Sequence, residues 1–339
     1  MMISYPETEQ YRTVIEKITR FPYRYKIEHG KSFPILKFVG TVKLHGTNAA
    51  VVYQKDTEQR CQSRNNIITP NFDNAGFACF MYPLAKRFLT ERILLDCPVI
   101  RKHYERGNPI VIYGEWCGGN IQRNVAICGL SKMFVIFKVR VGESNPPLWL
   151  DPKDWSNLRW SEQSIYNIYD FSTYEIDIDF NQPKFSQNKL IKITESVEQQ
   201  CPVGAHFNQK GVGEGVVWTE WTQSRGILTF KVKGKEHSVS KVKQLASVDT
   251  EKFGNLHDFV DYACTENRMH QALDYLYEKE LSVEMENFET FLKWLADDII
   301  KEESDTMNDS NIDPKDVACA ITTKAKAWFQ DQLFLYFSQ

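Results

Sequence analysis

The sequence predicts an α+β protein, with a large domain built on antiparallel or mixed sheets and a small all-helical domain after it. Short runs of β-branched and aromatic residues recur through the first part of the chain, each bounded by Gly, Pro, Asn or charged residues. After about residue 250 these runs stop, and apolar residues are spaced as in helices. A chain of 339 residues is also too long for one modest core. We therefore expect one domain over residues 1–245 and a second over residues 250–339.

Strands dominate the informative parts of the first domain. One helix is expected from Phe77 to Leu95, where apolar residues have helical spacing, and another from Ile191 to Gln200. These helices do not alternate regularly with the strands, so we do not expect a doubly wound parallel sheet. The runs that predict strands cover residues 35–44, 48–54, 109–116, 133–141, 215–221 and 226–233.

Three helical segments are expected in the second domain, two of them marked by an apolar stripe. Asp313 followed by Pro314 is a favourable N-cap and first-turn pair for the last helix. The polar stretch from Lys301 to Asn311 is expected to form the loop before that helix. The stripes consist of Phe288, Phe291, Leu292, Leu295 and Ile299, and of Val317, Ala320, Ile321, Ala325 and Trp328.

The composition indicates neither a membrane protein nor a disulfide framework. The apolar runs are far too short to cross a bilayer, and the N-terminus lacks the pattern of a secretory signal. Eight cysteines are scattered without a CxxC pair, which favours reduced thiols in a cytoplasmic compartment. A net charge of −3 counts mildly against nucleic-acid binding, but a local basic patch is enough to bind a phosphate backbone. Such a local cluster is formed by Lys231, Lys233, Lys235, Lys241 and Lys243.

The strongest local signal is the hexapeptide Lys43-Leu44-His45-Gly46-Thr47-Asn48, which joins two predicted strands. A lysine amine attacks phosphorus only when it is deprotonated, although its ordinary pKa is about 10.4. Neighbouring cations and metal ions lower that pKa. Gly46 would allow the backbone to approach a phosphate or ribose closely. The hexapeptide taken alone is also compatible with a surface lysine in a hairpin.

Five further motifs follow the hexapeptide, in the order Ser63-Arg64-Asn65, Tyr113 to Gly118, Phe134 to Phe137, Glu214 to Trp218, and Phe230 to Lys233. Together the six segments resemble the covalent nucleotidyltransferase superfamily of ligases and capping enzymes, and most of all the nick-sealing, type 2 RNA ligase family. His45 and Asn48 stand where DNA ligases and capping enzymes usually have Asp and Arg. The resemblance covers residues 35–245 and implies a nucleotidyltransferase (ATP-grasp-like ligase) domain.

The resemblance implies an ATP-dependent enzyme that carries AMP on Lys43 and transfers it to RNA. His45 and Asn48 would act in the later steps, when the RNA ends are engaged. Arg64 would hold the ribose or phosphates, and Glu115 would accept hydrogen bonds from the ribose hydroxyls. Each of these residues also has a purely structural alternative; a glutamate at a strand end, for example, is usually just solvated.

The remaining implied contacts are to the base, the metal ion and the α-phosphate. Phe137 would stack on adenine, with Phe134 as the weaker candidate, although Phe137 is also compatible with a core position. Glu214 would bind Mg²⁺ or Mn²⁺. Lys231 and Lys233 alternate on one predicted strand, so they share a face and would contact the α-phosphate, but such lysines are most often simply exposed.

The resemblance also implies a partner, a cosubstrate and a departure from the family pattern. The cosubstrate would be ATP with Mg²⁺ or Mn²⁺, and the partner RNA, as a nicked duplex or as RNA ends, bound by a monomer. Lys138 follows Phe137 where the family commonly has an aspartate. Two alternatives stay open: a DNA ligase or GTP-using capping enzyme, and an RNA-binding relative that has lost catalysis, for which Lys138 is the best support.

Overall fold

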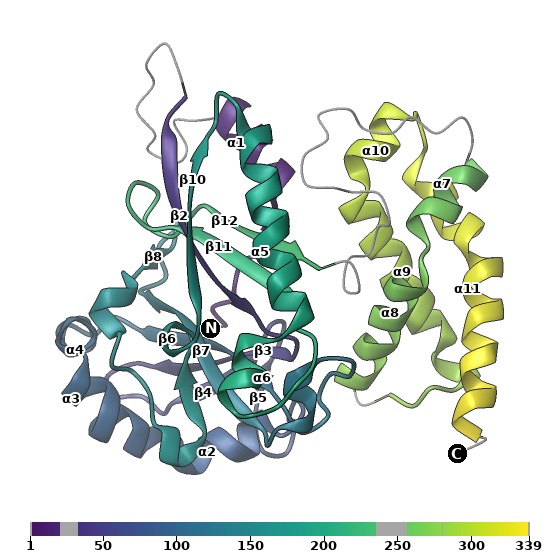
Figure 1. The fold of residues 1–339 in the computed structure, drawn as a ribbon. Coiled ribbons are helices and arrows are strands. Elements are labelled where there is room, and N and C mark those ends of the chain that lie inside the picture. Colours follow the sequence, from purple (N-terminus) through teal and green to yellow (C-terminus); the bar gives the residue numbers. More distant parts are fainter. Residues whose placement is uncertain (1, 21–32, 235–255, 280, 338–339) are drawn as a thin grey trace. The chain divides into compact units, whose positions relative to one another are not determined.

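The computed structural model describes residues 2–20, 33–234, 256–279 and 281–337. The chain divides into two compact units, Met1–Gly234 and Lys235–Gln339. All the strands of the described residues belong to the first unit, and the regular elements described in the second unit are helices (Figure 1). The predicted α+β fold is confirmed.

The first unit contains two sheets. Sheet A has the strand order β1-β12-β11-β2-β10, and its neighbours are antiparallel except for the parallel pair β1–β12. Helices α1 and α5 cover one of its faces, where Phe38, Trp218 and Phe230 are completely buried. The elements are β1 (Glu9–Gln10), α1 (Tyr11–Arg20), β2 (Ile35–Lys43), β10 (Thr173–Asp179), α5 (Gln187–Gln199), β11 (Gly215–Glu220) and β12 (Thr229–Lys233).

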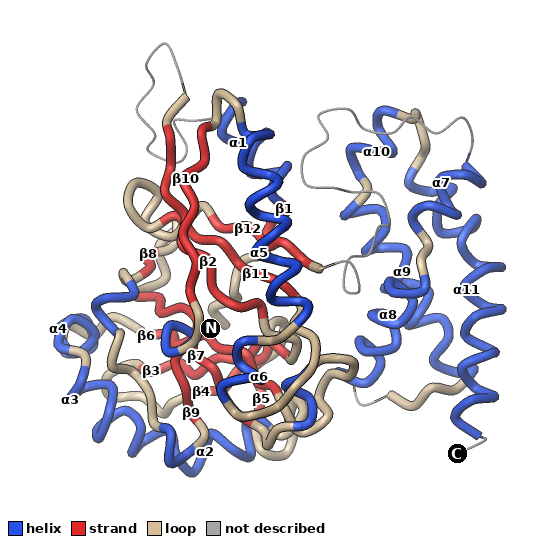
Figure 2. Tube along the Cα trace, viewed as in Figure 1, coloured by secondary structure: helices blue, strands red, loops and turns tan. Residues whose placement is uncertain are grey.

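Sheet B has the order β5-β4-β3-β6-β7-β8, with β9 paired to β7. The helices from α2 to α4 pack on one face of this sheet, as the outer blue helices of the first unit show in Figure 2. Its elements are β3 (Thr47–Tyr53), β4 (Arg60–Ser63), β5 (Ile67–Ile68), α2 (Phe77–Phe88), the π-helical turn η2 (Leu89–Ile93), α3 (Leu94–Asp96), α4 (Pro98–Glu105), β6 (Ile110–Cys117), β7 (Met133–Val141), β8 (Leu148–Trp149) and β9 (Ile165–Asn167).

The two faces of sheet B carry different side chains because successive residues of a strand point in opposite directions. Val51 and Ile112 point to the helices and belong to the hydrophobic core between the helices and this sheet. Val52, Val111 and Tyr113 point to the other face, where they form a second, smaller cluster with Ile3, Ala50 and Trp149. Asn48 and Glu115, two of the site residues predicted from the sequence, also point to this second face, as described below.

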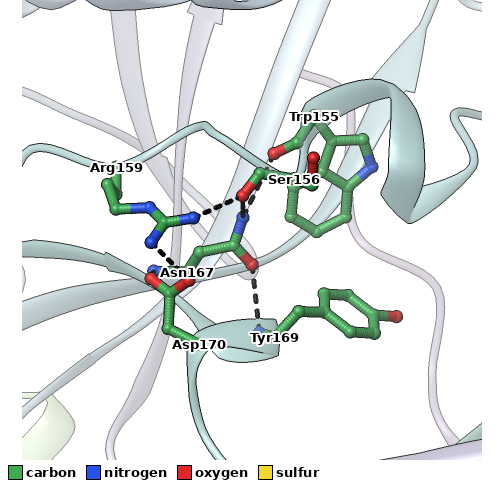
Figure 3. A network of polar contacts seen from close by, with 6 residues as sticks. All are labelled: Trp155, Ser156, Arg159, Asn167, Tyr169 and Asp170. Atoms are coloured by element: carbon green, nitrogen blue, oxygen red, sulfur yellow. Dashed lines mark hydrogen bonds and ion pairs between the residues drawn. The ribbon is translucent and has the colours of Figure 1, made fainter.

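Short helical turns connect the strands, and one of them is held by a polar network centred on Asn167 (Figure 3). The Asn167 side chain donates to the carbonyl of Trp155 at 3.1 Å and accepts from the Tyr169 amide at 3.0 Å. An ion pair of 2.9 Å joins Arg159 to Asp170. Because β9 pairs with β7, this network supports the strand that carries Phe137. The short elements are η3 (Ala126–Gly129), η4 (Pro152–Trp155), η5 (Ser161–Gln163), η6 (Ile168–Asp170), η7 (Pro183–Ser186) and α6 (Pro202–His206).

The described part of the second unit is built from helices around one apolar core. Inside it, the guanidinium of Arg268 is fully buried and lies 2.9 Å from Asp298 and 3.1 Å from Glu303. Two carboxylates thus balance one buried cation, as burial of a charge requires. The elements are α7 (Leu256–Ala263), α8 (Glu266–Glu278), η8 (Met285–Asn287), α9 (Phe288–Glu302), α10 (Ser304–Asp309) and α11 (Pro314–Phe337).

The structure confirms the six predicted strands and both apolar stripes, which form the buried sides of α9 and α11. The Asp313 side chain accepts from the Lys315 amide at 2.9 Å, as expected of an N-cap. The prediction of a loop from Lys301 to Asn311 is wrong, because α10 forms there and buries Met307 in the core.

The local basic cluster predicted from the sequence lies only partly within the described residues. Of the local basic cluster, Lys235, Lys241 and Lys243 lie outside the described residues. None of the helices in the described ranges has the length and apolar character needed to span a lipid bilayer.

Candidate active site

The register of sheet A brings two lysines to one carboxylate. Gly215 begins β11 and is paired on one side with Lys43, the last residue of β2, and on the other with Lys233, the last residue of β12. Glu214 directly precedes Gly215 and therefore lies between them. Its Oε2 atom is 2.5 Å from Nζ of Lys43, and its Oε1 atom is 3.1 Å from Nζ of Lys233.

Glycine at position 215 is required by the close approach of β12. Gly215 has a φ of 153°, and a Cβ atom there would lie 2.1 Å from the carbonyl oxygen of Val232. No other residue fits without moving the backbone of β12. Glu214 and Gly215 therefore act as a pair. Gly215 allows β11 to begin in close contact with β12, and this start places Glu214 between Lys43 and Lys233.

The turn after Lys43 docks on the edge of β6. The amide of Gly46 donates to Oε1 of Glu115 at 3.0 Å, and a Cβ atom on Gly46 would lie 2.4 Å from the carbonyl of Trp116. Asn48 stands directly opposite Glu115 in the β3–β6 pairing, so both side chains share one face of sheet B. His45 places Nδ1 3.5 Å from Oε2 of Glu214. The hexapeptide thus joins the two glutamates of the site.

The electrostatics of the site favour a reactive amine at Lys43. Burial lowers the pKa of Lys43, the nearby cation of Lys233 lowers it further, and the carboxylate of Glu214 opposes both effects. For Glu214, burial raises the pKa, but the cations of Lys43 and Lys233 outweigh it and hold the pKa well below its usual range. Burial raises the pKa of Glu115 to about 7, and the charge of Glu214 contributes to that rise.

A β-bulge determines which phenylalanine faces the site. Tyr113 of β6 pairs with Lys138 and the next residue, Gly114, pairs with Ile136, so Phe137 has no partner of its own. Phe134 is fully buried on the helix side, 4.9 Å from the ring of Phe77. Phe137 instead packs on the Tyr113 face, the face to which Glu115 also points. Phe134 therefore lies in the core, and Phe137 lies on the face of the candidate site.

Lys231 and Arg64 are the two remaining residues predicted for the site. Lys231 lies two residues before Lys233 and on the same face of β12. Arg64 lies in the exposed turn after β4. Burial raises the pKa of Tyr5, and the charge of Arg64 opposes that rise.

Tyr5 and two tryptophans were not found by sequence reasoning. The ring of Tyr5 lies 5.1 Å from Phe137, 5.2 Å from Tyr113 and 5.7 Å from Trp149. Trp221 packs on the same cluster. No motif marks these residues, because only the tertiary fold brings residues 5, 149 and 221 together.

The donor set suits a hard cation that is shared with a substrate. Among the described residues there is no group of three or more His, Cys, Asp or Glu side chains able to enclose a metal ion. Glu214 is nevertheless close enough to Glu115 for its charge to raise the pKa of that carboxylate. Mg²⁺ is commonly bound by one or two carboxylates together with substrate phosphates, so these residues fit such an ion.

Comparison with known proteins identifies the family. The family described as RNA ligase matches residues 36–243. No curated protein matches the chain. Among solved structures the chain is similar to Naegleria gruberi RNA ligase: a variant with ATP and Mn (17% identity, TM-score 0.42), the protein with PPi (17%, 0.42) and another variant with AMP and Mn (18%, 0.43).

Each of these three alignments covers 69% of this chain and 56% of the Naegleria chain, so this chain matches little more than half of that protein. The family match, in contrast, extends over more than half of the 339 residues and includes every motif from Lys43 to Lys233. The chain therefore belongs to the RNA ligase family.

Proposed function

We propose that this protein is an ATP-dependent RNA ligase that joins a 3′-hydroxyl end to a 5′-phosphate end and carries AMP on Nζ of Lys43. The observation that carries the proposal is the position of that amine. It lies 2.5 Å from Glu214, whose carboxylate also contacts Lys233, and it has a lowered pKa and a side chain that is 21% exposed. A buried carboxylate thus positions an amine that a substrate can still reach.

The proposed reaction has three steps. The neutral amine of Lys43 attacks the α-phosphorus of ATP, pyrophosphate leaves, and the amine loses its extra proton. An oxygen of the RNA 5′-phosphate then attacks the same phosphorus and breaks the P–N bond, so AMP passes to the RNA end. The 3′-hydroxyl finally attacks the RNA phosphorus, and AMP leaves as a new phosphodiester forms. The lysines supply positive charge where negative charge develops on phosphate oxygens.

The residues around Lys43 have separate roles in this proposal. Lys231 and Lys233 contact the α-phosphate, Glu115 and Arg64 bind the ribose or phosphates, and Phe137 stacks on adenine. His45 and Asn48 act when the RNA ends are engaged, since the hexapeptide turn carries both beside the glutamates.

Glu214 is the residue that would hold Mg²⁺ or Mn²⁺, together with the phosphates of ATP. When bound, the ion would supply charge neutralisation for the triphosphate. Because Glu214 accepts a hydrogen bond from Lys43 in the structure, a cation bound to the same carboxylate would weaken the anionic partner of the ammonium. The neutral form of Lys43 is then favoured.

The test is to incubate the protein with Mg²⁺ and α-labelled ATP, and then to add a nicked RNA duplex with a 5′-phosphate. We expect label on the protein, loss of label on addition of RNA, and a sealed strand. Removing the metal with EDTA should stop labelling, and Mg²⁺ or Mn²⁺ should restore it. Labelling by GTP rather than ATP would indicate a capping enzyme, and binding of RNA without any label would indicate a relative that lacks catalysis.

The two phenylalanines provide a matched pair for the position of the base. Phe137→Ala should raise the KM for ATP by about 2- to 13-fold, because an aromatic stacking contact contributes about 0.5–1.5 kcal/mol. Phe134→Ala should instead lower the free energy of unfolding by about 3–5 kcal/mol, because it empties a fully buried core site. Denaturant unfolding and the ATP dependence of labelling measure the two effects. An unchanged KM in Phe137→Ala would remove this residue from the base site.

A further inference from the structure

The amine of Lys138 is buried among aromatic rings. The residue is 3% exposed, and its Nζ atom lies 4.6 Å from the ring centre of Trp149 and 5.4 Å from that of Trp221. It donates hydrogen bonds to the carbonyl of Gly226 at 2.8 Å and to Oγ1 of Thr229 at 3.0 Å. Lys138 belongs to sheet B and both acceptors follow β11, so these bonds tie the two sheets together.

The β-bulge explains why Lys138 reaches this place. Two successive residues of a bulged strand oppose one residue of the partner, so Phe137 and Lys138 both lie on the Tyr113 side of β7. Burial lowers the pKa of Lys138 to about 7. A buried lysine costs stability that an apolar side chain of similar length would not cost. Packing alone therefore gives no reason for an amine at this position.

Lys138 donates to a loop, residues 221–228, that is already fixed by internal hydrogen bonds. Glu220, the last residue of β11, is buried, and its carboxylate accepts from the loop amides of Thr222 at 2.7 Å and of Gln223 at 2.9 Å. The Gly226 amide donates to the Glu220 carbonyl at 2.7 Å. Gly226 has a φ of 80°, and a Cβ atom there would lie 2.5 Å from the ring of Trp221. Within this tight loop, the Gly226 carbonyl accepts the Lys138 amine.

The hydrogen bonds of Lys138 to Gly226 and Thr229 lie at one end of β12, and the contact between Glu214 and Lys233 lies at the other end. One face of β12 carries Thr229, Lys231 and Lys233, at every second position. Lys233 forms an ion pair with Glu214, and Thr229 accepts a hydrogen bond from Lys138. Four residues of extended strand separate the two ends, a distance of roughly 13 Å. If the phosphates bind at Lys231 and Lys233 and the base stacks on Phe137, as proposed above, the base lies towards the 221–228 loop, because Trp221 and Ile227 of that loop pack on the same cluster as Phe137.

We propose that Lys138 is a positioning residue for the base of ATP, which fixes the 221–228 loop relative to Phe137 and so sets the affinity for the nucleotide. This inference rests on the proposed function, because it takes ATP as the ligand. Lys138 contacts neither Glu214 nor Lys43 in the interactions that the structure defines for it, so it acts on binding rather than on phosphoryl transfer.

The test uses Lys138→Met, which keeps the length of the side chain and removes the amine. We expect the KM for ATP in lysyl-AMP formation to rise about 10-fold while the rate at saturating ATP changes less than about 2-fold, the pattern of lost uniform binding. The Kd for ATP, measured by calorimetry in EDTA, should rise by the same factor. Lys132→Met is the matched control: it also removes an amine that donates to a main-chain carbonyl, that of Ala75 at 2.8 Å.

Stability separates a positioning role from a structural one. Replacing a buried charged group by an apolar one is often neutral or stabilising, so Lys138→Met should unfold at the same or a higher denaturant concentration than the wild type. Thr229→Val removes one of the two acceptors and should raise the KM less. The double variant should bind ATP no more weakly than Lys138→Met alone, since both changes break one interaction.

The outcomes distinguish this inference from the proposed function. If the wild type is labelled by ATP and Lys138→Met keeps its KM and Kd, the positioning role is wrong while the ligase proposal stands. A lower rate at saturating ATP with an unchanged KM also overturns the positioning role. If the wild type binds ATP but takes no label, the ligase proposal fails, and the Kd of Lys138→Met still decides the role of Lys138.

Discussion

Lys43→Ala is expected to abolish covalent attachment of AMP, with labelling reduced by at least about 10³-fold, as for the loss of other catalytic nucleophiles. The protein should stay folded, because Lys43 ends β2 with its side chain partly exposed and Glu214 keeps Lys233 as a partner. Lys43→Arg should be equally inactive. It retains a cation beside Glu214, but a guanidinium is not deprotonated in proteins and cannot act as the nucleophile.

The matched control is Lys37→Ala. Lys37 lies on the same face of β2 and forms an exposed ion pair with Glu175 at 2.8 Å, so its loss should leave labelling unchanged. RNA that already carries AMP on its 5′ end bypasses the first step, so Lys43→Ala should still seal it measurably. If labelled AMP attaches to Lys43→Ala, another nucleophile carries the nucleotide and the proposed assignment is wrong.

Much of the fold is readable from the sequence because the strands that build the site have strong local signals. Residues 133–141 and 215–221 are β-branched and aromatic, and each strand is bounded by turn residues. The α10 helix was missed because its sequence, SDTMND, is mostly polar and has no helical apolar stripe. Only the burial of Met307 in the core of the second unit explains why this segment is helical.

The site itself is partly readable for the same reason. Lys43, Glu115, Glu214 and Lys233 lie at or beside strand ends, so motifs of four to six residues locate them. Their convergence depends on the pairing of β11 with both β2 and β12, which no local pattern specifies. The surroundings of Lys138 were likewise hidden. A lysine inside a strand predicts an exposed side chain, and only the bulge and the tertiary contacts show that this one is buried.

Glu214 and Lys233 should change the pKa of Lys43 in opposite directions, and this is the second large effect expected at the site. The carboxylate of Glu214 raises the pKa of Lys43, so Glu214→Gln should lower it. The cation of Lys233 lowers that pKa, so Lys233→Met should raise it. The two shifts are measured in metal-free protein by titrating the Nζ resonance of Lys43 with ¹⁵N-labelled lysine, and Lys37→Met should produce neither shift.

A lower pKa would by itself make more of the neutral amine, yet Glu214→Gln should reduce labelling by at least about 100-fold, the scale of losing one preorganised electrostatic partner. The reason is that the Glu214 carboxylate orients two amines at once, through contacts of 2.5 Å to Lys43 and 3.1 Å to Lys233, and would also hold the metal ion. A neutral amide provides one acceptor oxygen and no charge for either task. If Glu214→Gln lowered the pKa of Lys43 and labelled faster, deprotonation alone would limit the reaction and the positioning role of Glu214 would be excluded.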